Sequence, residues 1–170
     1  MLAGCNADPT APQEETIYVA VYHWGFALFN EDGTEREEIR IPKGTDLTLY
    51  AVNDHAHDAF HSLPEPVATS VKELHPLERT KEHVAAGRIL GPSDGTIEEN
   101  YEETHDHNAG SGDHTLIIPG FHVNLDLNHH QEEPAEATIT ANKVGTSSFV
   151  CGAHRGYGHA FMKQELLFVE

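Results

Sequence analysis

The most informative segment of this 170-residue chain is Cys151-Gly152-Ala153-His154-Arg155-Gly156-Tyr157-Gly158-His159-Ala160-Phe161-Met162. It holds one thiol, two imidazoles and one thioether in a glycine-rich stretch between two apolar runs. Copper accepts soft sulfur and imidazole nitrogen together, and two His with one Cys and a weak axial Met form the blue-copper arrangement. The segment supplies Cys151, His159 and Met162 for such a site. His114, which begins the apolar run 114–119, is the best candidate for the second His.

Short runs of apolar and β-branched residues on both sides of this segment predict strands. They cover residues 16–29 (one strand or two), 38–41, 46–53, 114–119, 121–127, 137–141, 147–150 and 161–169. Residues 46–53 alternate between apolar and polar side chains, which predicts a half-buried antiparallel strand. Short strands separated by turns, without a long helix, are typical of an all-β sandwich or barrel.

Residues 54–112 interrupt this pattern and predict an insertion with its own small structure. The capping-box pattern at residues 70–73 and the run 76–86, which ends at Gly87, predict one or two short helices there. The insertion holds seven of the 14 His of the chain. Imidazole suits copper, zinc and nickel alike, so five of these side chains are candidates for a second metal site: His55, His57, His61, His105 and His107. The alternatives are a solvated surface loop and a lid over the first site.

The N-terminal segment, residues 1–15, has no periodic pattern. Leu2-Ala3-Gly4-Cys5 is similar to the processing box of prokaryotic lipoproteins, in which the Cys is lipidated. We therefore expect residues 1–15 to tether a domain at residues 16–170 to the outer face of a membrane through Cys5. A loose N-terminus with an incidental Cys is the alternative.

Acidic residues outnumber basic residues by 28 to 10, which gives a formal charge of −18. Such a charge argues against binding to nucleic acid or to an anionic lipid surface, because both need Lys and Arg. The acidic residues are spread along the whole chain, either as an ordinary solvated surface or as an adaptation to high salt, where screening weakens self-repulsion. We expect a halophilic source. No apolar run approaches the roughly 18 to 20 residues of a membrane-spanning helix.

The chain resembles the copper-binding domain of cytochrome c oxidase subunit II, a cupredoxin. A Trp-Gly pair and an Ile-Pro-x-Gly turn of that family are matched by Trp24-Gly25 and Ile41-Pro42-Lys43-Gly44. The family's first copper His lies in a His-Ser-Phe-x-x-Pro segment, which corresponds to residues 114–119, and its Cys-x₃-Cys-x₃-His-x₂-Met loop ends as residues 158–162 do. The resemblance covers residues 16–53 and 113–170. It implies a cupredoxin-like Greek-key β-sandwich in which copper is bound by His114, Cys151, His159 and Met162.

Two positions depart from that family's pattern. Arg155 stands where the family has its second Cys, and one thiolate cannot bridge the two ions of a binuclear centre, so we expect a mononuclear site with one copper ion per chain. His154 gives the spacing Cys-x₂-His-x₄-His, which is similar to that of nitrosocyanin, a red copper cupredoxin. In that alternative Cys151, His154 and His159 bind copper with His114, and Met162 only packs. Four other His belong to no motif: His23, His122, His129 and His130.

Three functions are compatible with these residues. The first is electron transfer to or from a redox partner protein with a basic patch, because a buried thiolate site with fixed ligands reorganises little between oxidation states. The second is small-molecule chemistry at an open red-copper centre, and the third is copper delivery or storage aided by the His-rich insertion. We expect an electron-transfer protein or a relative of an oxidase subunit more than a stand-alone enzyme.

Overall fold

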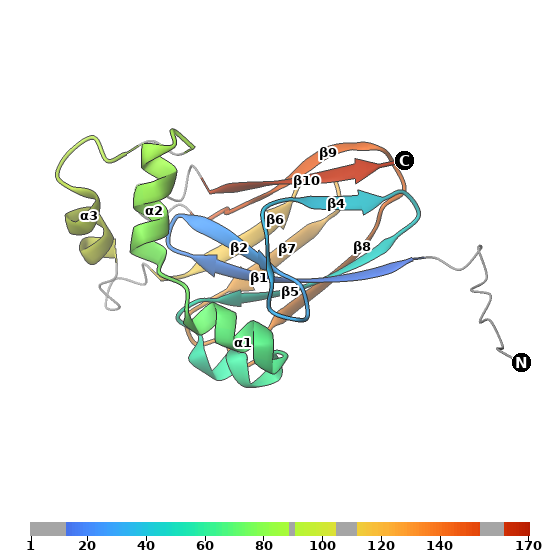
Figure 1. The fold of residues 1–170 in the computed structure, drawn as a ribbon, viewed down its shortest axis with the longest axis horizontal. Coiled ribbons are helices and arrows are strands. Elements are labelled where there is room, and N and C mark those ends of the chain that lie inside the picture. Colours follow the sequence, from blue (N-terminus) through green and yellow to red (C-terminus); the bar gives the residue numbers. More distant parts are fainter. Residues whose placement is uncertain (1–12, 89–90, 105–111, 154–161) are drawn as a thin grey trace, which may run out of the picture.

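Ten strands form two facing sheets in the part of the chain that the computed structural model describes, residues 13–88, 91–104, 112–153 and 162–170 (Figure 1). The first sheet, in the order β3-β2-β1-β5-β8, contains β1 (Glu14–Tyr22), β2 (Gly25–Phe29), β3 (Glu35–Arg36), β5 (Asp46–Asn53) and β8 (Ala135–Thr140). The second, in the order β4-β10-β9-β6-β7, contains β4 (Ile39–Pro42), β6 (His114–Ile118), β7 (Val123–Leu127), β9 (Gly145–Val150) and β10 (Lys163–Val169). The predicted β-sandwich is confirmed.

The core between the sheets is built from alternate residues of the strands. Ile17 and Val19 of β1 are fully buried in the same apolar cluster as Phe149 of β9 and Leu166 of β10. Successive side chains of a strand point to opposite faces, so each sheet contributes one face to this cluster.

The outer face of the first sheet is also covered. Ala20 and Tyr22 of β1 belong to a second apolar cluster with Phe60 and Val67, which lie on the 3₁₀ helix η1 (His57–Ser62) and on helix α1 (Glu65–Lys72). Strand β1 is therefore buried on both faces, which explains why its sequence is almost continuously apolar.

Strand β5 differs from the prediction in its pairing. It runs parallel to β1 and antiparallel to β8, so it lies inside the sheet between them. Its exposure alternates from Asp46 to Tyr50, as predicted, and the alternation ends at Val52, which is buried in the second apolar cluster with residues of the insertion.

The insertion contains more helix than predicted. Besides η1 and α1 it forms α2 (Pro76–Ala85) and α3 (Ile97–Thr104), with α2 as predicted. The capping-box prediction is wrong: α1 begins after Pro64, and Ser70 lies inside it and donates its hydroxyl to the Gly33 carbonyl. The Ser70 hydroxyl thus forms a tertiary hydrogen bond instead of capping the start of a helix. Among the described residues, no helix combines the length and apolar character needed to span a membrane.

Helices α2 and α3 lie beyond one end of the sandwich (Figure 1). The β1–β2 turn, the end of β5, the start of β6 and the end of β9 meet at this end, as the contacts below show. His114 and Cys151 of the predicted copper site lie at this end, whereas His57 and His61 lie on η1.

Candidate metal centre

His114 and Cys151 are brought together by two neighbouring strands. His114 is the first residue of β6, Cys151 follows the last residue of β9, and these strands pair antiparallel at Ile117 and Val150. The Nδ1 atom of His114 lies 3.9 Å from the Sγ atom of Cys151. His114 is 1% exposed, whereas Cys151 is partly buried.

This separation fits two ligands of one metal ion. Metal–sulfur and metal–imidazole bonds of about 2.3 and 2.0 Å, at an angle near 120°, place the two donor atoms about 3.7 Å apart. A thiolate and an imidazole are donors that copper accepts together. The side chains of His114 and Cys151 could therefore bind one copper ion together.

Thr115 supports the Cys151 segment from β6. Its backbone N–H points at the Cys151 Sγ from 3.5 Å, and its hydroxyl oxygen accepts a 2.7 Å hydrogen bond from the N–H of Gly152. Gly152 is packed closely, since a Cβ at this position would lie 2.5 Å from the Cδ1 of Ile117. Sequence patterns did not single out Thr115, because its role depends on the pairing of β6 with β9.

Met162 lies directly before β10. The Cys151 N–H donates to its carbonyl at 3.4 Å, which joins the two ends of the β9–β10 loop. Its side chain is 2% exposed and belongs to the core between the sheets, against which Cys151 also packs. This position agrees with a ligand role and with the packing role that the red-copper alternative gives to Met162.

The rest of the predicted copper set lies outside the described residues: His154, Arg155 and His159. Among the residues that are described, no group of three or more His, Cys, Asp or Glu side chains could hold a metal ion. The structure thus brings together His114, Cys151 and the Met162 backbone.

The candidates for a second metal site do not converge in the described part of the chain. His55 is partly buried, with its Nε2 3.7 Å from the Oδ1 of Asp54. His57 stacks on Phe60 with ring centroids 5.5 Å apart, and both His57 and His61 are exposed on η1. Three further predicted residues lie outside the described ranges: Cys5, His105 and His107.

Asp54 is a buried carboxyl group at the start of the insertion. Its side chain is 7% exposed, and its Oδ1 has no hydrogen-bond partner among the described residues. Burial raises the pKa of Asp54 to about 7. The pKa of Tyr101 on α3 is raised as well, first by burial and then by the nearby Asp54 carboxylate.

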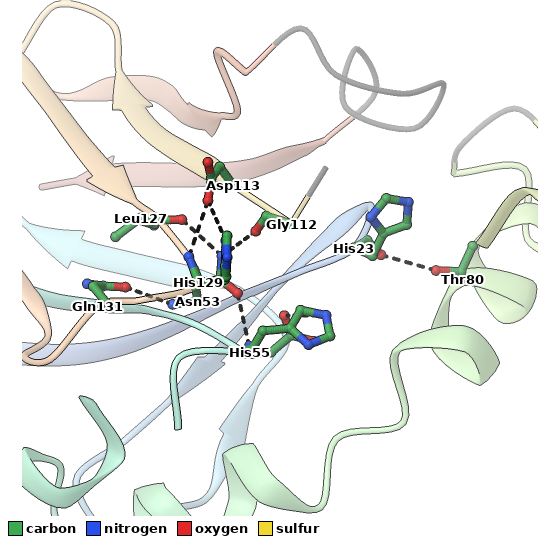
Figure 2. A network of polar contacts seen from close by, with 10 residues as sticks. His23, Asn53, His55, Thr80, Gly112, Asp113, Leu127, His129 and Gln131 are labelled. Atoms are coloured by element: carbon green, nitrogen blue, oxygen red, sulfur yellow. Dashed lines mark hydrogen bonds and ion pairs between the residues drawn. The ribbon is translucent and has the colours of Figure 1, made fainter. Parts of the chain in front are cut away.

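Asn53, the last residue of β5, joins the two ends of the insertion (Figure 2). Its side chain donates to the carbonyls of Gly112 at 2.5 Å and Leu127 at 2.9 Å, and its Oδ1 accepts from the N–H of His55 at 2.9 Å. The Asn53 N–H donates to the Gln131 side chain at 3.1 Å. This fully buried residue fixes the chain two residues before His114.

Asp113, beside His114, is held by His129. The Oδ1 of Asp113 lies 2.9 Å from the Nδ1 of His129 and accepts from the His129 N–H at 3.3 Å (Figure 2). The chain is therefore anchored at both residues that precede His114, by Asn53 from the first sheet at Gly112 and by His129 after β7 at Asp113.

His23, which belongs to no sequence motif, is buried beside His114. It lies in the β1–β2 turn, is 2% exposed, and its ring centroid is 6.4 Å from that of His114. The only sequence signal for this placement is indirect: the turn and the start of β6 lie at the same end of the sandwich.

Solved structures with a similar fold include a heme-copper terminal oxidase dimer, which is 14% identical with a TM-score of 0.50 and is matched over 95% of this chain and 67% of that chain. They also include the periplasmic domain of subunit II of cytochrome oxidase of Bradyrhizobium japonicum, which is 13% identical with a TM-score of 0.50 over 92% of this chain and 84% of that chain. A scan of protein-family models and a search of curated proteins found no match. The resemblance to subunit II is thus confirmed at the level of the fold, and the chain is a cupredoxin-like β-sandwich.

Proposed function

We propose that this chain is a mononuclear copper protein that transfers electrons. The observation that carries the proposal is the 3.9 Å separation between the Nδ1 of buried His114 and the Sγ of Cys151, in a fold similar to that of the periplasmic domain of subunit II. Arg155 in place of a second Cys supports one copper ion per chain, because a single thiolate cannot bridge two.

In this proposal His114, Cys151 and His159 would hold the ion, with Met162 as a further, weaker ligand. Copper supplies a one-electron couple when it is bound there. The chain's own residues give the site its character: the Thr115 N–H orients the Cys151 sulfur and stabilises its negative charge, and burial of His114 excludes water from one side. Fixed ligands in a partly dry site need little rearrangement when an electron arrives or leaves.

We place the protein outside the cytoplasm, tethered to the membrane through a lipid on Cys5. The support is the lipoprotein-like Leu2-Ala3-Gly4-Cys5 sequence and the periplasmic location that the similar subunit II domain has. The charge of −18 favours a redox partner with a basic surface. A halophilic source would explain why the negative charge is so large.

Copper loading tests the proposal directly. The purified chain is titrated with Cu(II), the metal per chain is counted, and optical and EPR spectra are recorded. We expect one ion, an intense thiolate-to-copper band and a small hyperfine splitting. A large hyperfine splitting with a red colour would favour His154 over Met162, and two strongly coupled ions would contradict the mononuclear site.

The two Cys residues provide a matched control. Cys151→Ser removes the sulfur donor, so we expect the coloured band to disappear and the affinity for copper to fall. Cys5→Ser makes the same change outside the proposed site, so its spectrum should equal that of the wild type. If Cys151→Ser keeps the coloured centre, the proposed ligand set is wrong.

A further inference from the structure

The β1–β2 turn places the ring of His23 beside that of His114, the proposed copper ligand. The ring of His23 lies between three others: Trp24 at 4.7 Å, Tyr101 of α3 at 5.4 Å and His114 at 6.4 Å between ring centroids. The ring of Tyr101 meets that of His23 edge-on, at 89°. Because His23 is 2% exposed and His114 is 1% exposed, a movement of one ring changes the space available to the other.

Helix α2 of the insertion holds this turn from outside. The hydroxyl of Thr80, which is 1% exposed, donates to the His23 carbonyl at 3.3 Å (Figure 2). One helical position earlier, the Arg79 guanidinium lies 5.9 Å from the centre of the Tyr22 ring and binds both carboxylate oxygens of Glu35, at 2.6 and 2.5 Å. A bidentate pair of this kind fixes direction as well as distance. Two neighbouring residues of α2 thus contact Tyr22 and His23, at the β1 end of the turn.

The turn has a conformation that needs such support. Trp24 has a φ of 70°, in the left-handed region that residues with a side chain rarely adopt. Gly25 has no room for a side chain, because a Cβ there would collide with the ring of Tyr22. A strained turn persists where its surroundings hold it in place.

We infer that His23 is a positioning residue for His114, and that α2 holds His23 in place through Thr80 and Arg79. The insertion is then part of the wall of the metal centre. The inference rests on the proposed function, because its consequence is a change in copper binding, but the arrangement of the rings belongs to the metal-free protein and is measurable there.

The first experiment compares Thr80→Val with the wild type. Valine keeps the volume of threonine but cannot donate a hydrogen bond to the His23 carbonyl. In the metal-free protein, NMR of the His side chains should show shifted ring resonances for His23 and His114. In the copper-loaded protein, the dissociation constant should rise about tenfold, as is typical when a residue that supports a metal ligand is removed, and the EPR hyperfine splitting should change.

Three variants serve as controls. Thr80→Ser keeps the hydroxyl group and should restore the wild-type ring resonances and copper affinity. Thr69→Val also removes a hydroxyl-to-carbonyl hydrogen bond, of 2.9 Å to Glu65, but from the exposed side of α1, so it should leave the His114 resonances unchanged. Arg79→Ala should shift the same rings as Thr80→Val, because it releases Tyr22 and Glu35.

The results separate the two proposals. If wild-type protein binds no copper through Cys151, the proposed function fails, while shifted His114 resonances in metal-free Thr80→Val still support the positioning role. If folded Thr80→Val and Arg79→Ala keep wild-type His114 resonances, copper affinity and EPR spectrum, the positioning role is wrong whatever the function. Should both variants unfold, His23→Phe, which keeps a ring of similar size, provides the same comparison.

Discussion

Thr115 on β6 holds the thiol of Cys151 from the neighbouring strand. Its N–H points at the Cys151 Sγ from 3.5 Å, and its hydroxyl accepts from the Gly152 N–H at 2.7 Å. A hydrogen bond to a ligating sulfur stabilises its charged form and tunes the potential of the metal bound to it. One residue of the second sheet thus contacts both the proposed donor sulfur and the backbone next to it.

Thr115→Val should weaken this support. The N–H of Gly152 loses its acceptor, and a hydrogen bond of this kind contributes about 1 kcal/mol, so the free energy of unfolding should fall by about that amount. In the copper-loaded protein the thiolate band should shift, since the backbone that carries Cys151 gains freedom. Urea unfolding and the optical spectrum measure the two effects.

The same substitution at an exposed position provides its control. Thr138 on β8 also has a hydroxyl contact, 3.3 Å from that of Thr48, but it lies on an exposed part of the first sheet. Thr138→Val should therefore leave the thiolate band unchanged. A band that is identical in Thr115→Val and wild-type protein would show that Thr115 does not support the sulfur.

Asn53→Ala should destabilise the fold more strongly. The change leaves the carbonyls of Gly112 and Leu127 and the N–H of His55 without their partner at a fully buried position. Each unsatisfied group costs about 1–3 kcal/mol, so we expect a loss of at least about 3 kcal/mol in thermal or urea unfolding. Asn142→Ala, at an exposed position after β8, should cost little. A loss below about 1 kcal/mol would mean that water replaces these bonds.

Much of the sandwich could be predicted because its signals are local. The run 46–53 has the bounds of β5, and His114 begins both the predicted run and β6. The parallel pairing of β5 with β1 was not predictable from alternation, since a half-buried strand alternates in either kind of ladder. The start of α1 was missed because the Ser70 hydroxyl binds Gly33, 37 residues away in sequence.

The site shows the same division between local and long-range information. Cys151 and Met162 were identified from the spacing within one loop, and His114 from its strand. His23 could not be identified in this way, because its burial depends on contacts with α2 and α3 from the insertion. A residue whose role depends on packing between segments distant in sequence cannot be recognised from the sequence around it.

Asp54 should make stability depend on pH in an unusual direction. Burial raises its pKa from 3.8 to about 7, so between these values the native state keeps a proton that the unfolded chain releases. The contribution of Asp54 to the free energy of unfolding is therefore complete below about pH 4 and decreases as the pH rises to about 7. At about 1.4 kcal/mol per pH unit, the full decrease is of the order of 4 kcal/mol.

Asp54→Asn removes this dependence. Relative to the wild type, the free energy of unfolding of the variant should rise between pH 4 and pH 8, by up to about 4 kcal/mol, because an amide cannot lose a proton. Comparing the two proteins at each pH cancels the titration of the other carboxyl groups. Asp58→Asn makes the same change on the exposed surface of η1 and serves as the control. A difference between Asp54→Asn and the wild type that does not vary with pH would mean that the Asp54 carboxyl group is solvated in the native protein.

Met162→Leu distinguishes the two copper arrangements. Leucine has a similar volume, so the core that contains Met162 should remain folded, at a cost below about 1.5 kcal/mol. If the thioether is the weak axial ligand, its loss changes the reduction potential and the EPR hyperfine splitting, because the axial ligand tunes both, while the thiolate band of Cys151 remains. His154→Ala should then leave the potential and the splitting at their wild-type values. In the reverse result, His154→Ala changes the spectrum and Met162→Leu leaves it unchanged. That result would assign His154 to the metal and Met162 to the core, because removing a side chain that binds copper changes the electronic structure of the ion.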